Sequence, residues 1–150
     1  MNLKQDKSSQ GFSLLEMLVT LSLMTSLFLI ALNNLNSLHD PLDNAASELL
    51  GFFKQVRARS ISTTSSYLVT PISSNQLEVT YAKNCTETTR QADSRLDLTL
   101  PSQVSFYTTD WSICYSARGL PDDNLSVQII KSDGSNATVE IFLGGGVRIT

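Results

Sequence analysis

One carboxylate, Glu16, stands near the start of an apolar run over residues 12–32 that contains no other charged residue. As a helix, this run would extend over roughly 30 Å, the thickness of the hydrocarbon core of a bilayer. A carboxylate in such a segment costs on the order of a few kcal/mol in lipid and usually has a functional partner. The partner that we expect is a new amino terminus, created at Phe12 by cleavage after Gly11.

The stretch before Gly11 is a short polar leader that carries Lys4 and Lys7. Secretory signal peptides have a small-residue cleavage site after the apolar run, whereas here the small residue precedes it. Cleavage at this glycine removes the leader and leaves the apolar segment on the protein. The positive-inside rule then places the leader in the cytoplasm and the chain after Asn33 on the other side of the membrane.

Residues 11–16, Gly-Phe-Ser-Leu-Leu-Glu, resemble the class III signal of type IV pilins and type II secretion pseudopilins. In that family a prepilin peptidase cuts after the glycine and methylates the new first residue. The resemblance implies that Gly11 ends the leader, that Phe12 becomes the methylated terminus, and that Glu16 neutralises the terminal amine of a neighbouring subunit. The alternative interpretation is an ordinary membrane anchor with a stray glutamate.

The composition is that of one small domain, with 150 residues, 41% hydrophobic and 17% charged. The formal net charge is -3, and loss of a leader with two lysines and one aspartate would leave about -4. Phosphate contacts dominate non-specific binding of nucleic acids, so an acidic chain is poorly suited to it.

Two cysteines, Cys85 and Cys114, lie in the part expected to be exported. An oxidising compartment favours a disulfide between them, and the alternative is two buried free thiols. Neither cysteine has another Cys or His at metal-ligand spacing, so we expect no zinc site and no cofactor.

An amphipathic helix is predicted from residue 42 to about residue 60, with Asp40 as its cap and Pro41 in its first turn. Its apolar positions recur at three and four residues: Leu42, Ala45, Ala46, Leu49, Phe52, Phe53 and Val56. Together with the apolar run, it would form one long N-terminal helix, half in lipid and half packed on a globular head.

Beyond a polar linker over residues 62–66, the hydrophobic period changes to two, which indicates strands. The predicted strands are 67–70, 76–81, 96–100, 104–107, 112–116, 125–130, 137–143 and 147–149, and Pro71 implies a sheet edge or a strand end. The fold class is α+β, with an antiparallel sheet packed on the amphipathic helix. The expected parts are a leader (1–11), a transmembrane and assembly helix (12–35), the amphipathic half of the helix (36–62) and a β-rich head (63–150).

The head resembles GspH/FimT-type minor pilins in three loose motifs: Ala58-Arg59-Ser60 near the helix end, the Arg118-Gly119 turn, and a glycine-rich turn before Arg148. This resemblance implies a subunit that primes or caps a type IV pilus or a type II secretion pseudopilus. Its implied partners are other pilin or pseudopilin subunits, the prepilin peptidase, the inner-membrane assembly platform and lipid. The implied location is the bacterial inner membrane, single-pass, with the head in the periplasm or outside the cell, and the filament after assembly.

A second hypothesis is DNA capture, because some FimT-like minor pilins bind DNA through arginines in a C-terminal Gly-Arg-x-Arg segment. Here the first arginine of that segment is absent, and Arg148 remains, with Arg118 as a possible neighbour. One or two arginines on an acidic head predict weak, salt-sensitive binding at most.

An enzymatic function has little support in the sequence, since the single histidine, His39, lies near the membrane boundary and no nucleophile has an evident base. Asp122 and Asp123 could bind calcium but are common turn residues, and we expect no metal site. Trp111 and Tyr107 are expected to complete the core rather than to be exposed for contact with a partner.

Overall fold

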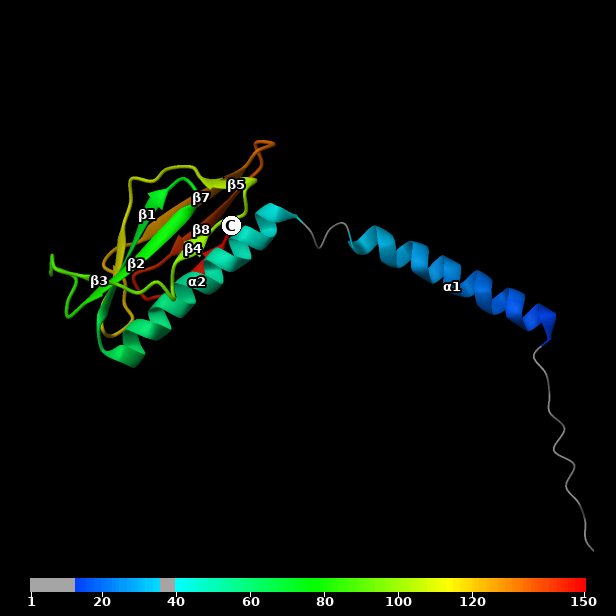
Figure 1. Cartoon of the computed structure of the whole chain (residues 1–150), viewed down its shortest axis with the longest axis horizontal. Helices are drawn as coiled ribbons and strands as arrows, with labels where there is room; N and C mark the ends of the chain where they lie inside the picture. Colours follow the sequence, from blue (N-terminus) through cyan, green and yellow to red (C-terminus); the bar gives the residue numbers. More distant parts are fainter. Residues whose placement is uncertain (1–12, 36–39) are drawn as a thin grey trace, which may run out of the picture. The chain divides into compact units, whose positions relative to one another are not determined.

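The computed structural model describes residues 13–35 and 40–150 (Figure 1). The chain divides into two compact units, Met1–His39 and Asp40–Thr150. The first unit contains helix α1 (Leu14–Leu35), and the second contains helix α2 (Pro41–Thr63) and all the strands described below. Helix α2 therefore belongs to the same unit as the strands. The predicted continuity of the two helices depends on residues 36–39, which lie outside the described residues.

Helix α2 begins as the sequence predicts. Asp40 is its N-cap and accepts a hydrogen bond from the backbone N–H of Leu42 at 2.9 Å, and Pro41 occupies the first turn. The Asp40 carboxylate also lies 3.4 Å from Nζ of Lys131, at the end of a strand in the head. This ion pair connects the start of α2 to the sheet behind it.

The end of α2 lies further along the chain than predicted, at Thr63, because Thr64 takes the left-handed conformation (φ 51°) that closes the helix. The hydroxyls of Ser62 and Thr63 donate to the carbonyl of Arg59, one turn earlier, so these polar residues fit within a helix. The prediction of a polar linker over residues 62–66 was therefore wrong except at the two residues between α2 and the first strand.

The strands form two antiparallel sheets, where the sequence predicted a single one. The first has the order β3-β2-β1-β6, with β4 also paired to β2, and the second has the order β5-β7-β8-β9. The bounds are β1 (Ser66–Ser73), β2 (Gln76–Ala82), β3 (Gln91–Ala92), β4 (Leu98–Thr99), β5 (Val104–Phe106), β6 (Ile113–Tyr115), β7 (Leu125–Lys131), β8 (Asn136–Ile141) and β9 (Val147–Ile149). Neighbours in sequence form the predicted hairpins, β1 with β2 and β7 with β8.

Pro71 lies in strand β1, at the point where the sequence predicts a sheet edge or a strand end. Strand β1 pairs with β2 on one side and with β6 on the other, but β6 reaches only as far as Val69 of β1. Beyond that point one side of β1 is a free edge, where a residue without an N–H is tolerated. A register irregularity follows between Pro71 and Ser73, so the prediction of an edge or strand end is confirmed although the strand itself continues.

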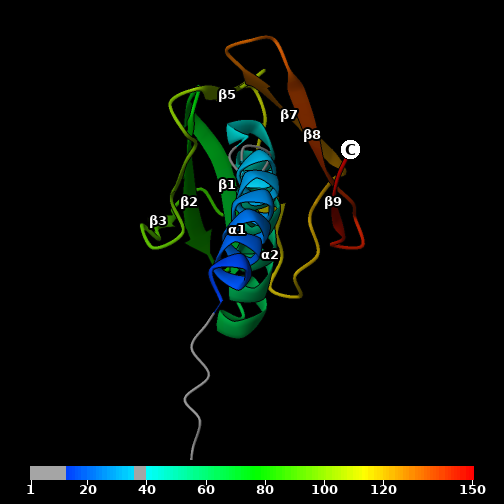
Figure 2. The ribbon, with the colours of Figure 1, turned by 90° about the vertical axis from the view of Figure 1, so that its right-hand side faces the viewer.

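The apolar face of α2 forms the centre of the core, because it contacts strands of both sheets (Figure 2). The predicted apolar positions of the helix are all buried: Leu42, Ala45, Ala46, Leu49, Phe52, Phe53 and Val56. Trp111 packs against this core, with its ring 5.9 Å from that of Phe106, as predicted. Tyr107 is 64% exposed, so the expectation that it completes the core was wrong. Because inward and outward positions alternate along a strand, burial of Phe106 directs its neighbour outward.

Cys85 and Cys114 form a disulfide bond, as the sequence led us to expect. Cys85 lies in the exposed turn after β2, and Cys114 is buried in β6, so the bond crosses β1. The turn is also held by Arg90, whose guanidinium donates to the carbonyls of Ser66 and Asn84. Burial lowers the pKa of Arg90, partly offset by Glu87. The sequence did not predict a structural role for Arg90, because its hydrogen-bond partners Ser66, Thr80 and Asn84 lie in separate segments of the chain.

The disulfide gives a first prediction. Cys85→Ser should lower the free energy of unfolding by about 3–4 kcal/mol, because the bond closes a loop of 29 residues. Cys85 is the suitable partner to change, since Cys114 is buried and a serine there would add a burial cost. Denaturant unfolding of the purified chain measures the effect. Thr88→Ser in the same loop is the control, and reductant should destabilise the wild type but not Cys85→Ser.

Candidate functional site

The carboxylate singled out in the sequence, Glu16, lies in the first turn of α1. Ser13 begins this helix: its hydroxyl oxygen accepts a hydrogen bond from the N–H of Leu15, and its carbonyl accepts from Glu16 and Met17. The positive end of the helix dipole favours a carboxylate at this position. Within the described residues Glu16 has no ion-pair partner and is exposed. Gly11 and Phe12, the predicted cleavage and methylation residues, lie outside the described residues.

From Leu14 to Leu29, the surface of α1 carries large apolar side chains around the helix, and Glu16 is its one charged residue. Its exposed large side chains have between 50% and 80% of their area accessible: Leu14, Leu15, Met17, Leu18, Val19, Leu21, Leu23, Met24, Leu27, Phe28 and Leu29. The hydroxyls of Thr20, Ser22, Thr25 and Ser26 donate to carbonyls three or four residues earlier, so they need no partner outside the helix. A helix with this surface requires apolar surroundings on all sides.

Among residues 13–35 and 40–150, no helix combines the length and the apolar character that a membrane crossing requires. The prediction of a transmembrane segment therefore stays a prediction.

A second site lies in the head, where Arg57 of α2 joins two turns that are distant in sequence. Its Nη1 donates to the carbonyl of Gly145 at 2.7 Å. Its aliphatic stem lies against Gly119, since a Cβ at that glycine would be 3.1 Å from Cγ of Arg57. Next to these groups is Tyr115, whose side chain is fully buried. Burial raises the pKa of the Tyr115 hydroxyl above its ordinary value, and the charge of Arg57 partly opposes this.

The two turns also touch each other, and both need glycine. Gly119 and Gly145 have φ values of 73° and 78°, a region that disfavours other residues. A Cβ at Gly145 would lie 2.7 Å from Cζ of Arg57 and 3.0 Å from the carbonyl oxygen of Gly119. The end of α2, the Arg-Gly turn and the glycine-rich turn thus meet at Arg57, whereas Arg59 of the first motif pairs with Asp93 elsewhere. Arg57, the residue that joins them, precedes the first motif and was not singled out.

The amino-terminal segment matches a known family. Residues 6–32 match the family model described as "Prokaryotic N-terminal methylation motif". This range contains Gly11, Phe12 and Glu16, and the whole apolar run over residues 12–32. Comparison with curated protein sequences found no significant match.

The fold of the rest of the chain is that of known pilin-type heads. One similar structure is the minor pseudopilin EpsH from the type 2 secretion system of Vibrio cholerae, with 11% identity, a TM-score of 0.56, and coverage of 74% of this chain and 97% of that one. Another is the type IV minor pilin FimU of Pseudomonas aeruginosa, with 13% identity, a TM-score of 0.54, and coverage of 73% and 87%. The chain thus carries a prokaryotic methylation motif at residues 6–32 and shares the fold of these two pilin-type structures. Motif and fold agree, although they concern different parts of the sequence.

The two arginines considered for DNA binding, Arg118 and Arg148, differ in their environment. Nε of Arg148, on β9, lies 2.6 Å from a carboxylate oxygen of Glu140, and its guanidinium lies 5.2 Å from the ring centre of Phe142. Arg118 is exposed and has no partner among the described residues. Arg118 lies in the turn that contains Gly119, and Arg148 follows the turn that contains Gly145. These two turns touch each other, but no contact between the two arginine side chains is found in the described part of the chain.

The aspartates considered for calcium have roles within the pilin-like head. A carboxylate oxygen of Asp122 accepts the N–H of Cys114 at 2.9 Å, and Asp123 accepts the N–H of Asn124. Asp122 therefore covers the outer edge of β6. Across residues 13–35 and 40–150, no group of three or more His, Cys, Asp or Glu is placed to hold a metal ion.

The contact of Arg57 with the turns at Gly119 and Gly145 gives a second prediction. Gly145→Ala should destabilise the head more than Gly134→Ala, by roughly 1–3 kcal/mol of unfolding free energy. Both glycines have positive φ, 78° and 91°, so both substitutions carry the backbone strain. Only at Gly145 does the added Cβ meet Arg57, whereas nothing lies within 4 Å at Gly134. Equal destabilisation of the two variants in thermal or denaturant unfolding would refute the role assigned to Arg57.

Proposed function

We propose that the protein is a minor pilin or pseudopilin, processed by a prepilin peptidase, that assembles into or primes a type IV pilus or a type II secretion pseudopilus. The observation that carries the proposal is the surface of α1. This helix exposes apolar side chains on all sides, has one carboxylate in its first turn, and overlaps a methylation motif. Such a helix is stable in lipid or among similar helices. In the proposed function it lies in lipid before assembly and among similar helices in the fibre.

Glu16 sets the register of assembly in this proposal. An unpaired carboxylate among packed apolar helices is costly, whereas a carboxylate paired with an ammonium group is tolerated. Cleavage after Gly11 creates such an ammonium group on Phe12 of each neighbouring subunit. The pairing can form only when the two amino termini lie at the same end of the assembly, so it also requires parallel subunits.

Processing and location follow from the same segment. The leader with Lys4 and Lys7 stays in the cytoplasm, the apolar segment is held in the inner membrane in a single pass, and the head lies in the periplasm. The disulfide between Cys85 and Cys114 supports an exported head, because such bonds persist in oxidising compartments. The partners would be other pilin-type subunits, the prepilin peptidase and the inner-membrane assembly platform.

We propose a structural role without catalysis, and a minor role within the fibre, on the basis of the fold shared with EpsH and FimU. The DNA-binding alternative gains no support from Arg148. Its guanidinium is already paired with Glu140 and lies close to the Phe142 ring, so a phosphate would have to displace a short ion pair.

Processing gives a third prediction. The chain purified from membranes of its host should begin at Phe12 with a methylated amine, as measured by intact mass spectrometry. Deletion of the prepilin peptidase should leave the leader attached. A native product that retains its first eleven residues in the presence of the peptidase would contradict the proposed function.

The assembly carboxylate gives a fourth prediction. Glu16→Gln should leave cleavage and membrane insertion unchanged but should strongly reduce recovery of the protein in sheared filament fractions, because the ion pair with the neighbouring terminus is lost. Immunoblots of membrane and filament fractions measure both steps.

The control variant for this experiment is Ser26→Ala. It lies on the same helix, and its hydroxyl is satisfied internally by the carbonyl of Ser22, so we expect normal incorporation. Wild-type recovery of Glu16→Gln in filaments would exclude the charge-pairing mechanism.

A further inference from the structure

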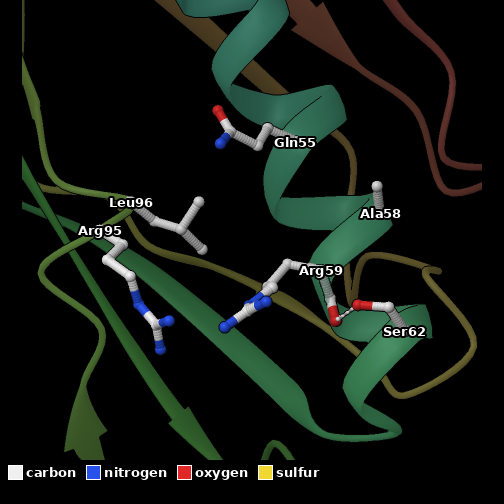
Figure 3. A pocket seen from close by; sticks show the side chains of 6 residues that line it. All are labelled: Gln55, Ala58, Arg59, Ser62, Arg95 and Leu96. Carbon is white, nitrogen blue, oxygen red and sulfur yellow. Dashed lines mark hydrogen bonds between the residues drawn. The ribbon is translucent and has the colours of Figure 1, made fainter.

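A groove runs along the exposed side of α2, between the helix and the segment that leads into β4 (Figure 3). It consists of two adjoining hollows of about 410 Å³ each, which share Gln55, Arg95 and Leu96. The helix side of the groove reaches from Glu48 to Ser62. We refer to these hollows together as the α2 groove. The function assigned to α1 and Glu16 does not use it.

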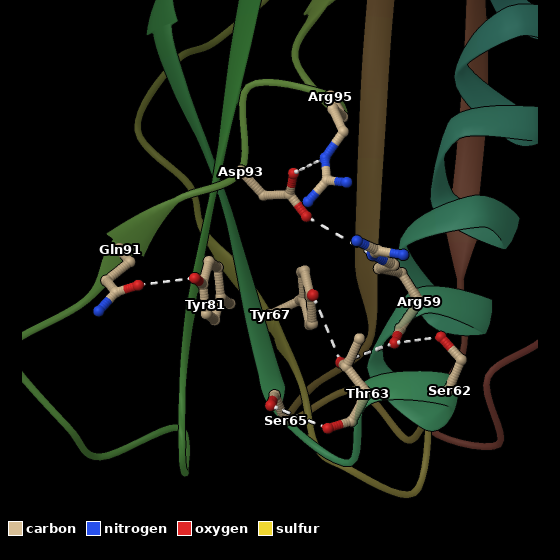
Figure 4. A network of polar contacts seen from close by, with 9 residues as sticks. All are labelled: Arg59, Ser62, Thr63, Ser65, Tyr67, Tyr81, Gln91, Asp93 and Arg95. Atoms are coloured by element: carbon tan, nitrogen blue, oxygen red, sulfur yellow. Dashed lines mark hydrogen bonds and ion pairs between the residues drawn. The ribbon is translucent and has the colours of Figure 1, made fainter.

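Two guanidinium groups, of Arg59 and Arg95, extend into one end of the α2 groove (Figure 3). Both are held by one carboxylate: Nε of Arg59 lies 3.6 Å from Oδ2 of Asp93, and Nε of Arg95 lies 3.2 Å from Oδ1 (Figure 4). Asp93 is only 5% exposed, and its backbone N–H donates to the carbonyl of Val79 on β2. The sheet therefore fixes the position of the carboxylate that orients both arginines.

These two arginines retain donors for a further anion. Each uses Nε toward Asp93, and among the described residues their terminal Nη groups donate no hydrogen bond. The side chain of Arg95 is 78% exposed and that of Arg59 is 37% exposed. Two positive charges face a single negative one, so this end of the α2 groove has an excess of positive charge. A carboxylate between the two guanidinium groups would be bound by charge-assisted hydrogen bonds.

The other end of the α2 groove has the opposite charge. Glu48 and Asp97 line it, both are exposed, and neither has an ion-pair partner in the described part of the chain. Glu48 precedes Arg59 by three helical turns, which places the two ends about 16 Å apart along the helix axis. Between them the lining contains the edges of three core side chains, Phe52, Leu96 and Leu98, each less than 8% exposed.

The helix face along the α2 groove includes a glycine that the head itself does not require. Gly51 lies within α2, and a Cβ built on it would meet nothing within 4 Å. An alanine there would fit and would favour the helix. The absence of a side chain at this position lets the backbone of another molecule approach α2 closely.

We propose that the α2 groove receives a segment of a different, neighbouring pilin-type subunit, and this proposal rests on the proposed function. The segment presents a carboxylate to Arg59 and Arg95, a basic group to Glu48 and Asp97, and apolar side chains between them. A nucleic acid does not match this surface, because its phosphates would be repelled by the acidic end. A second copy of this chain is the competing occupant, and the experiment below distinguishes it from a different subunit.

The experiment uses the full-length chain in its host, with a photo-activated cross-linking residue in place of Gln55, in the middle of the α2 groove. After irradiation, we expect an adduct with one other pilin-type subunit, identified by mass spectrometry through a sequence that carries its own methylation motif. Arg95→Glu in the same chain should reduce this adduct severalfold, because it reverses the charge of the anion-binding end.

Matched variants separate binding from folding. Arg118→Glu makes the same charge change at an exposed arginine outside the α2 groove and should leave the adduct unchanged. Gly51→Ala should raise the melting temperature but reduce the adduct, a combination that a purely structural role does not produce. Asn44→Ala, at an exposed position of α2 outside the lining, should favour the helix without reducing the adduct.

Several results would overturn the proposal: an adduct with a second copy or with nucleic acid, no adduct in filaments that contain the chain, or equal effects of Arg95→Glu and Arg118→Glu. In each of these cases the chain is processed and incorporated, so the proposed function stands and the docking site is wrong. A chain that is never processed or incorporated would instead overturn the proposed function, and this docking site with it.

Discussion

The head depends on one surface, the apolar face of α2. Seven of its side chains are buried, and strands from both sheets pack against them. Several strands have only two or three residues, too few to be stable without packing against another element. Because the helix contacts both sheets, it joins their apolar faces into one core. The ion pair between Asp40 and Lys131 holds the start of the same helix against the sheet.

The polar side of the last turns of α2 has two different roles. Arg57 points into the head and joins two glycine turns, whereas Arg59, two residues later, points to the α2 groove and meets Asp93. Positions two apart on a helix do not share a face, so neighbouring arginines can serve the interior and the surface separately. This arrangement explains why the helix end, the Arg-Gly turn and the glycine-rich turn form one structural unit.

The two units of the protein differ in how far their apolar side chains are buried. The head buries most of its large apolar side chains in one core, while α1 leaves its large apolar side chains accessible from Leu14 to Leu29. A helix of this kind depends on what surrounds it for its stability, which is lipid before assembly and other helices afterwards in the function we propose. The α2 groove would add a contact between heads, where charge and shape can distinguish one subunit from another.

Local patterns in the sequence were sufficient for the features that depend on near neighbours. The methylation motif, the Asp40 cap, the apolar stripe of α2 and the hairpins all follow from residues only a few positions apart. The pairing of Cys85 and Cys114 followed from there being only two cysteines. Partners of this kind can be identified without knowing how the chain folds.

Only the tertiary structure decided the features that depend on distant segments. The division of the strands into two sheets, the orienting role of Asp93 and the contact of Arg57 with Gly145 each join residues that have no local relation. The burial of Asp93 and the disulfide across β1 likewise join segments that are distant in sequence. These features depend on packing, which is the sum of many weak contacts between residues far apart in the sequence. Local sequence patterns do not predict such contacts.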